Sequence, residues 1–301
     1  MDYKHVEAKE NCIVIKDVAN FDPVHIFECG QCFRWNKIRD NDFIGVAYGR
    51  VIEVIKEGND VIIYNSNEED FYNIWCEYFD LNQDYSNIKQ ELSKDPLLKK
   101  AVDFGYGIRI LKQEPFEIVI SFIISANNRI PMIKRAIENI SKRWGEPIEY
   151  KGVTYYTFPS VEKLAAVEET ELESCGLGFR AKYVKDTVSN IYSSLQGLEG
   201  FEKYNIYEIA KMSDDDCHRA LQQFNGIGPK VGDCIMLFSM NKISAFPVDV
   251  WVKRAMMHFY TAPDLSLKKI RDFARDKFGS LAGFAQQYLF YYARENNIKI
   301  E

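Results

Sequence analysis

The chain has 301 residues, of which 47% are apolar and 27% are charged, and its formal net charge is −6. This length and apolar fraction allow more than one hydrophobic core, so we expect two or three lobes. The acidic balance argues against a protein that coats polyanions indiscriminately, and it leaves local basic patches open. The N-terminus lacks an apolar core, and no run approaches the roughly 20 apolar residues of a membrane span. We therefore expect a cytoplasmic protein without a membrane partner.

Cysteines and basic residues give weaker indications. The chain is large enough to fold without disulfides, so we expect reduced thiols at its seven scattered cysteines, Cys12, Cys29, Cys32, Cys76, Cys175, Cys217 and Cys234. Bases concentrate in residues 129–143 and 268–277. Most charge runs are solvated helix faces, so these two stretches alone do not establish nucleic-acid binding.

The first third of the chain is predicted to form strands. Residues 43–66, FIGVAYGRVIEVIKEGNDVIIYNS, alternate apolar with polar or small residues and turn at Gly58-Asn59. Residues 12–17, CIVIKD, are expected to join the same sheet. From Glu68 onward the apolar residues recur at helical spacing, so almost everything later is predicted to be helical. The fold class is therefore α+β.

Several of the predicted helices have recognisable starts. The segment PFEIVISFIISANN begins at Pro115 and is apolar on every face, which indicates a central buried helix that ends at two asparagines. Later helices are predicted to start at Ser213, Pro229, Asp249 and Ser280, because these residue types cap helices or fit their first turn.

Two of these helices are joined by FNGIGPK, residues 224–230, within which the chain must reverse. Gly226 and Gly228 can adopt the positive φ that such a turn needs. A helix-hairpin-helix built this way presents free backbone N–H groups and a helix N-terminus, which suit a DNA phosphate. An ordinary turn between packed helices explains the two glycines equally well.

Lys230 and Asp249 add chemistry to the hairpin. An amine at a helix N-terminus feels the positive end of the dipole, and partial burial also favours its neutral, nucleophilic form. A phosphate-binding or solvated lysine is the alternative. Asp249, in the segment FPVDV, fits a helix cap, and a carboxylate near an amine also stabilises the positive charge that develops when a glycosidic bond breaks. The pair therefore indicates glycosidic chemistry.

The segments LQQFNGIGPKVGDC and FPVDV resemble the helix-hairpin-helix, Gly/Pro-rich, aspartate superfamily of DNA base-excision glycosylases. Four further segments are similar to the 8-oxoguanine DNA glycosylases within it: CGQCFRW (29–35), SFIISANN (121–128), GLGFRAKYV (176–184) and AGFAQQYLF (282–290). The resemblance implies an N-terminal antiparallel β-sheet domain followed by two all-α lobes with a cleft between them. It also implies a monomer that acts on double-stranded DNA containing 8-oxoguanine, and we expect no organic cofactor.

The resemblance also assigns a base pocket. Acting on a base in duplex DNA requires flipping the nucleotide out of the stack. Phe290 and Cys234 would sandwich the flipped base, Gln286 would bond its Watson-Crick edge, and the Gly30 carbonyl would accept the N7 hydrogen that guanine lacks. Lys230 would attack the sugar C1′ with Asp249 stabilising the cationic sugar, and a Schiff base would lead to β-elimination. Asp233 is interpreted as a carboxylate on the helix surface or as one that supports the site without touching the substrate, rather than as a catalytic one.

Other matched residues face the partner strand. Asn127 would fill the gap left by the flipped base, Arg180 would reach the orphaned partner, and Phe179 would wedge between bases. The chain departs from the family pattern at Arg129, Met132, Phe179 and Trp251, where many relatives have asparagine, arginine, tyrosine and histidine. Met132 cannot donate hydrogen bonds to an opposite cytosine, so the sequence predicts relaxed opposite-base selectivity.

We expect residues 1–110 to form the sheet domain with its following helices, and residues 111–301 to form the helical glycosylase region. Gly226, Gly228 and Trp251 are the expected DNA-backbone contacts, and a structural cation at the hairpin carbonyls is left open. The alternatives are a glycosylase for another damaged purine and a non-catalytic helix-hairpin-helix module. The CGQC motif admits a redox or zinc site, but the histidines are scattered, and no cysteine follows Cys234 to complete an iron-sulfur cluster.

Overall fold

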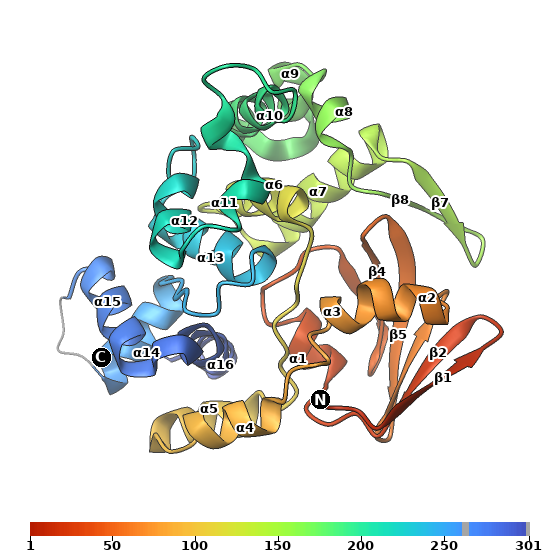
Figure 1. Ribbon diagram of the computed structural model, residues 1–301, viewed down its shortest axis with the longest axis vertical. Helices are drawn as coiled ribbons and strands as arrows, with labels where there is room; N and C mark the ends of the chain where they lie inside the picture. Colours follow the sequence, from red (N-terminus) through yellow and green to blue (C-terminus); the bar gives the residue numbers. More distant parts are fainter. Residues whose placement is uncertain (261–264, 299–301) are drawn as a thin grey trace.

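A six-stranded antiparallel sheet forms the N-terminal part of the computed structural model, which describes residues 1–260 and 265–298 (Figure 1). Its order is β1-β2-β6-β5-β4-β3, with bounds His5–Lys9 (β1), Cys12–Lys16 (β2), Trp35–Arg39 (β3), Asp42–Ala47 (β4), Arg50–Glu57 (β5) and Asp60–Tyr64 (β6). The predicted strands, their common sheet and the turn at Gly58 are confirmed. β1 and β3 are strands that the sequence pattern did not indicate.

Short helices cover one face of this sheet. They are α1 (Pro23–Phe27), α2 (Glu68–Asp70), the π-helical turn η1 (Phe71–Trp75) and α3 (Cys76–Tyr78). Their aromatic side chains form the sheet core, in which Phe27 stacks on Trp35 with ring centroids 3.9 Å apart and Trp75 is completely buried. Aromatic rings contribute large buried areas, so a small domain obtains a stable core from few residues.

The remainder of the described chain is mostly helical. After α4 (Tyr85–Leu92) and α5 (Pro96–Phe104) come α6 (Pro115–Ser125), α7 (Ile130–Trp144), α8 (Val161–Ala165), α9 (Glu169–Leu172), η2 (Glu173–Leu177), η3 (Gly178–Arg180), α10 (Ala181–Leu195), η4 (Glu202–Tyr204) and α11 (Ile206–Ile209). The chain then forms α12 (Asp214–Leu221), α13 (Pro229–Ser239), α14 (Val250–Phe259), α15 (Leu267–Phe278), η5 (Gly279–Leu281) and α16 (Ala282–Glu295).

A β-hairpin interrupts the helices, so the expectation that the later chain is all helical is wrong at this point. β7 (Pro147–Tyr150) pairs with β8 (Val153–Tyr156) around a turn in which Gly152 has φ +74°. The hairpin packs on the sheet, where the Tyr150 hydroxyl donates to Glu53 at 2.9 Å. Its β-branched and aromatic residues favour strands, and the contact with the sheet stabilises a hairpin that would be marginal alone.

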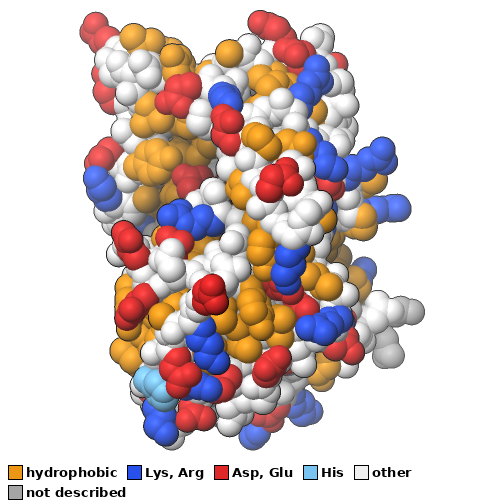
Figure 2. Space-filling view, turned by 90° about the vertical axis from the view of Figure 1, so that its right-hand side faces the viewer, with side chains coloured by type: hydrophobic (Ala, Val, Ile, Leu, Met, Phe, Trp, Pro, Cys, Tyr) orange, Lys and Arg blue, Asp and Glu red, His pale blue; other side chains and the backbone are white. Residues whose placement is uncertain are grey.

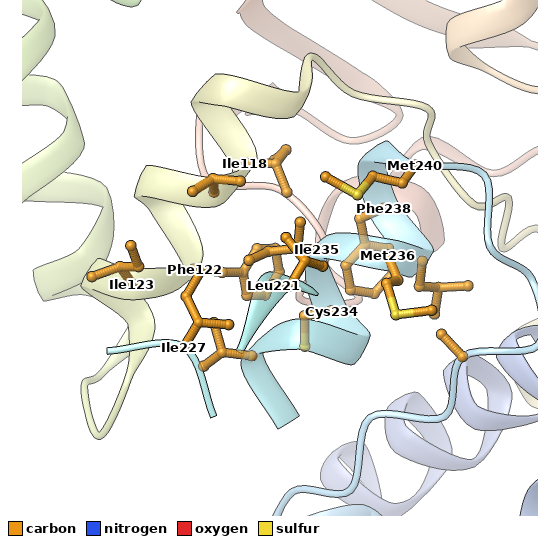
Figure 3. Packing of buried hydrophobic residues seen from close by; sticks show 14 of the residues in the cluster. Ile118, Phe122, Ile123, Leu221, Ile227, Cys234, Ile235, Met236, Phe238 and Met240 are labelled. Carbon is orange, nitrogen blue, oxygen red and sulfur yellow. The ribbon is translucent and has the colours of Figure 1, made fainter. Parts of the chain in front are cut away.

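The helix α6 is the centre of the helical part, as its all-apolar sequence predicts. Phe116, Ile118, Phe122 and Ile123 are among its buried residues. Figure 3 shows α6 side chains, Phe122 among them, packing against α13, and the Phe122 and Phe238 rings stack with centroids 5.6 Å apart. Because α6 contacts α7, α10, α11 and α13, it fixes the position of the hairpin helix from behind.

Three of the four later helix starts are confirmed. Ser213 caps α12, Pro229 is the first residue of α13, and Asp249 caps α14. The prediction that Ser280 caps the last helix is wrong. Gly279, at φ +55°, ends α15 and opens the turn η5, which continues directly into α16 without a side-chain cap.

The sheet core and the helical core interleave along the chain. Ile110 belongs to the helical core and Leu111 to the sheet core, while α4 and α5 join the helical core and α5 contacts α16. The division at residue 110 follows the order of the chain, and it stays a prediction. Within the described residues, no helix is both long and apolar enough to cross a membrane.

Candidate active site

One small pocket collects both the predicted catalytic and the predicted base-recognition residues. Its lining comes from the loop after α1 and from α6, α13, the segment before α14, and α16. The residues that line it are Cys29, Gly30, Phe122, Lys230, Cys234, Phe238, Pro247, Asp249, Gln286, Gln287 and Phe290. The four-residue spacings Lys230/Cys234 and Gln286/Phe290 place each pair on one helix face, and the fold turns the two faces toward each other.

Lys230 is the second residue of α13 and is half-buried. Its Nζ lies 5.5 Å from the ring centroid of Phe122, so an aromatic wall shields one side of the amine. Pro229 starts the helix with the φ that a first turn needs and has no N–H to leave unpaired. The amine therefore reaches the pocket from the positive end of a helix dipole, as the sequence predicts.

Asp249 lies at the N-terminus of α14, where its Oδ1 accepts from the Val252 amide at 2.8 Å. The preceding residues Phe246, Pro247 and Val248 are buried, which holds the carboxylate at the pocket. Burial raises the pKa of Asp249, and the opposing effects of the Val252 amide and the charge of Lys230 do not cancel that rise. The carboxylate is therefore both a helix cap and a buried anion beside an amine.

This raised pKa predicts the acid side of the pH profile. Because stabilising a cationic sugar needs ionised Asp249, the excision rate should fall as pH drops through a pKa above about 3.9, the ordinary aspartate value. Single-turnover excision rates at successive pH values measure that limb. Asp249→Asn, which keeps a capping oxygen, should lose most activity. The activity that remains should not fall at acid pH in this way. A limb at the ordinary carboxyl pH would contradict the assignment.

The walls of the pocket suit a planar base. Burial raises the pKa of Cys234 to about 11, so its thiol is neutral near pH 7. Gly30 has φ +83°, and a Cβ there would lie 3.0 Å from a Phe290 ring atom, so both backbone and space require glycine. Gln286 is 4% exposed, and its side-chain oxygen has no partner among the described residues. An unpaired buried amide costs about 1–3 kcal/mol, so this group is suited to a ligand.

The CGQC motif belongs to this pocket, because Cys29 and Gly30 line it. Burial raises the pKa of the Cys29 thiol to about 11 and that of Cys32 further, whereas a redox motif needs a lowered value. Across residues 1–260 and 265–298, no group of three or more His, Cys, Asp or Glu side chains could hold a metal ion. The motif therefore positions a glycine and supports neither alternative.

The hairpin turns as predicted at one glycine and differently at the other. Gly226 has φ +88°, and a Cβ there would come within 2.9 Å of the Tyr183 ring. The expectation of positive φ at Gly228 is wrong, because its φ is −91° and it serves as the extended N-cap of α13. Gly228 and Pro229 are exposed, and the Gly228 amide donates no hydrogen bond within the described chain. A free amide at a helix start can bind a phosphate.

The residues assigned to the partner strand do not line the base pocket. Asn127 is exposed with φ +50°, while Met132 and Phe179 are 46% and 56% exposed. Arg180 is instead buried, and its guanidinium donates to the carbonyls of Ala126 and Asn127 at 2.7 Å each. In this structure Arg180 therefore fastens the Asn127 turn. A contact with an orphaned base requires these bonds to be exchanged.

The two basic stretches differ in what they offer DNA. In the C-terminal stretch, Arg271 pairs with Asp233, Arg275 with Asp215 and Lys277 with Asp95, so most of its charge is neutralised. Arg129 and Arg135 are exposed, and no side-chain partner is found for either in the described chain. The face that carries the β1–β2 and β7–β8 hairpins intersperses acids and bases, as Figure 2 shows, so it presents no single-sign field.

Asp233 precedes Cys234 in α13 but does not line the base pocket. It is 1% exposed, so the helix-surface interpretation is wrong, and it receives two hydrogen bonds from Arg271 at 2.6 and 2.8 Å. This bidentate pair joins α13 to α15.

Trp251, the remaining predicted backbone contact, is half-buried in the first turn of α14, with the Arg254 guanidinium 4.9 Å from its ring centroid.

Comparison with known proteins agrees with this arrangement. Residues 13–119 match the N-terminal domain of 8-oxoguanine DNA glycosylase, and residues 120–279 match the HhH-GPD superfamily of base excision DNA repair proteins. A probable N-glycosylase/DNA lyase of Methanothermobacter thermautotrophicus is 36% identical over 73% of this chain and 74% of its own length. The N-glycosylase/DNA lyase OGG1 of Arabidopsis thaliana is 31% identical over 88% and 75%. The chain belongs to the 8-oxoguanine DNA glycosylase family.

A solved structure of another protein matches this chain over nearly its whole length. The 8-oxoguanine glycosylase/lyase of Clostridium acetobutylicum, bound to double-stranded DNA with cytosine opposite 8-oxoguanine, is 60% identical. The match covers 99% of this chain and 100% of that one, with a TM-score of 0.95. The predicted order of a sheet domain and helical lobes is therefore that of this glycosylase family.

The structure adds pocket residues that sequence reasoning missed. Phe122, Phe238 and Pro247 line the pocket, and Gln287 and Arg294 contact the loop that carries Gly30. The position of Gln287, adjacent to Gln286, was a visible signal, since a second glutamine in a helix facing a core needs a partner. Arg294 left no such signal, because its partner lies 266 positions away along the chain.

Proposed function

We propose that this chain removes 8-oxoguanine from duplex DNA and then cleaves the strand by β-elimination. The observation that carries the proposal is the pocket itself, in which an amine, a buried carboxylate and an unpaired glutamine amide converge. Family membership supports the reaction type. A module that only holds the DNA backbone has no use for such a lined pocket, and the comparisons do not favour a glycosylase for another damaged purine.

The chemistry proposed for the pocket starts with Nζ of Lys230 as the nucleophile. Its lone pair forms a bond to C1′ while the C1′–N9 bond breaks, and the departing base takes the bonding electrons and a proton. That proton comes from Nζ. The C1′–O4′ bond then breaks as Nζ forms a double bond to C1′, and O4′ takes a proton from solvent, which gives a protonated Schiff base on the opened sugar. Removal of a C2′ proton then expels the 3′-phosphate. Asp249 stabilises the positive charge that develops on the sugar.

Recognition is proposed to depend on N7, which carries a hydrogen in 8-oxoguanine and a lone pair in guanine. The N7 hydrogen of 8-oxoguanine would donate to the Gly30 carbonyl, whereas guanine would place its N7 lone pair against it. An unpaired buried carbonyl costs about 1–3 kcal/mol, which corresponds to roughly ten- to a hundredfold in preference. Further rejection of guanine must therefore occur before the base enters the pocket.

The test is release of the free base from matched duplexes. The chain is incubated with duplexes that contain one 8-oxoguanine, one 3-methyladenine or only normal bases, and the released bases are identified by mass spectrometry. We expect release of 8-oxoguanine alone, followed by strand cleavage. Release of the methylated base in preference would establish the other-purine function, and DNA binding without release would establish the binding module.

Met132 leads to a prediction about the partner strand. A methionine side chain donates no hydrogen bond, so excision opposite cytosine and opposite adenine should proceed at comparable single-turnover rates. Met132→Arg, which adds donors, should raise the cytosine-to-adenine rate ratio by about tenfold or more. Val153→Arg adds the same charge at an exposed site on the β7–β8 hairpin and should leave the ratio unchanged. A native chain that strongly prefers cytosine would contradict the prediction.

We further propose a monomer that acts in the cytoplasm, at the nucleoid if the cell is bacterial, without an organic cofactor. The Gly228 amide, with Gly226 shaping the turn and Trp251 alongside, is proposed to contact the DNA backbone. The carbonyls of Asn225 and Ile227 accept no hydrogen bond within the described chain. They fit the oxygen ligands of a hard cation, which would orient the hairpin carbonyls and leave the amides to DNA.

A further inference from the structure

The loop that carries Gly30 has its backbone carbonyls bonded on both sides of that glycine. Gln287 Nε2 donates to the Cys29 carbonyl at 2.8 Å, and Arg294 Nη2 donates to the Glu28 carbonyl. On the other side, Gln113 Nε2 donates to the Gln31 carbonyl at 2.8 Å. Side chains from distant parts of the chain therefore bond the carbonyls of Glu28, Cys29 and Gln31, on both sides of Gly30.

The Gly30 carbonyl itself accepts no hydrogen bond within the described residues. Gly30 lines the base pocket, and its φ of +83° sets its peptide apart from its neighbours. Because the carbonyls on both sides are bonded, the loop around Gly30 is tied to α16 by Gln287 and Arg294 and to the segment before α6 by Gln113. The loop is thus held in one orientation before any base arrives.

Two of the three donors come from the helix that also carries the base-binding side chains. Gln287 directly follows Gln286 on α16, and Arg294 lies four residues after Phe290, with its guanidinium 5.2 Å from the Phe290 ring centroid. Gln287 is 1% exposed, so its bond to Cys29 is shielded from water. α16 therefore fixes the distance between the Gly30 carbonyl and the residues assigned to the rest of the base.

We propose that Gln287 and Arg294 are positioning residues for discrimination between 8-oxoguanine and guanine. This inference rests on the proposed function, in which the Gly30 carbonyl reads N7. A fixed carbonyl cannot turn away from the N7 lone pair of guanine, so guanine bears the full cost of the mismatch. A released loop would relax around guanine and would also bond 8-oxoguanine less well, because preorganisation is lost.

The experiment measures binding and chemistry separately. In a Lys230→Gln background, the affinities for duplexes with 8-oxoguanine and with guanine at the same position are measured by fluorescence anisotropy, alone and with Gln287→Leu or Arg294→Met added. With Lys230 intact, single-turnover excision is measured on the 8-oxoguanine duplex. Arg143→Met is the matched control for the loss of an arginine, because Arg143 pairs with Glu171 and makes no hydrogen bond to the Gly30 loop.

We expect each loop variant to lower the affinity ratio of 8-oxoguanine to guanine by about tenfold, the size of one lost hydrogen bond. Arg294→Lys, which retains a donor, should recover part of the ratio, and Arg143→Met should not change it. Equal loss of affinity for both duplexes, or an unchanged ratio in both variants, would overturn the inference. A native chain that shows no preference for 8-oxoguanine would instead overturn the proposed function.

Discussion

Lys230→Gln is expected to abolish base release and strand cleavage together. The substitution removes the only atom that the proposed mechanism uses to attack C1′, while a neutral amide of similar length remains to fill the space. Loss of a nucleophile lowers single-turnover rates by about 10⁴-fold or more. The measurement is excision from a duplex with one 8-oxoguanine, resolved as base release and as strand cleavage.

Lys268→Gln is the matched control for the loss of positive charge. Lys268 is exposed on α15 and lies in the groove that also borders Lys230, but it does not line the base pocket. This variant should keep the native excision rate and show only a modest change in DNA affinity. If Lys230→Gln released the base at the native rate, water would be the nucleophile and the lysine would have another role.

Arg109→Met is expected to destabilise the fold by about 3–5 kcal/mol, the cost of removing one member of a buried ion pair. The guanidinium is completely buried, bonds Asp2 at 2.7 Å and donates to the Phe79 carbonyl at 2.8 Å. It also lies 4.1 Å from the Tyr85 ring centroid. Methionine would fill the space but leave the Asp2 carboxylate without its cationic partner and the Phe79 carbonyl without its donor.

Urea unfolding monitored by tryptophan fluorescence measures that loss. Asp2→Asn keeps an acceptor oxygen and should cost less than Arg109→Met. Arg143→Met breaks an exposed pair with Glu171, whose side chains are 44% and 42% exposed, and should cost about 1 kcal/mol or less. An Arg109→Met protein as stable as the Arg143→Met protein would show that the buried network contributes nothing net.

Features with a local signal could be predicted from the sequence. Pro229 and Asp249 mark helix starts by their backbone and side-chain chemistry, and the apolar run after Pro115 marks a buried helix. These signals placed the amine and the carboxylate at adjacent helix N-termini, and the four-residue spacings placed the pocket walls. Local signals also failed twice, because Ser280 does not cap the last helix and Gly228 does not adopt a positive φ.

Features that depend on distant partners could not be predicted. The β7–β8 hairpin exists because Tyr150 and its neighbours pack on a sheet formed about a hundred residues earlier, as the contact with Glu53 shows. Asp233 has the sequence context of a surface residue until Arg271 folds back onto it. The bond from Gln287 to Cys29 spans 258 positions, so no spacing rule could indicate it.

Charge runs were the least informative part of the sequence. The stretch 268–277 carries five bases, but Arg271, Arg275 and Lys277 pair with acids from three other elements. Arg180 similarly bonds the carbonyls of the Asn127 turn. A cation indicates a polyanion only where the fold leaves it unpaired, and that depends on tertiary contacts rather than on composition.

Borohydride trapping shows whether Lys230 attacks the sugar of the damaged nucleotide. The native chain and Lys230→Gln are each incubated with a duplex that contains one 8-oxoguanine and with the undamaged duplex, in the presence of borohydride. A covalent protein–DNA adduct that requires both Lys230 and the lesion would establish the amine as nucleophile and the oxidised purine as substrate. Adduct formation in the Lys230→Gln protein, or clean base release by the native chain without any adduct, would contradict the account.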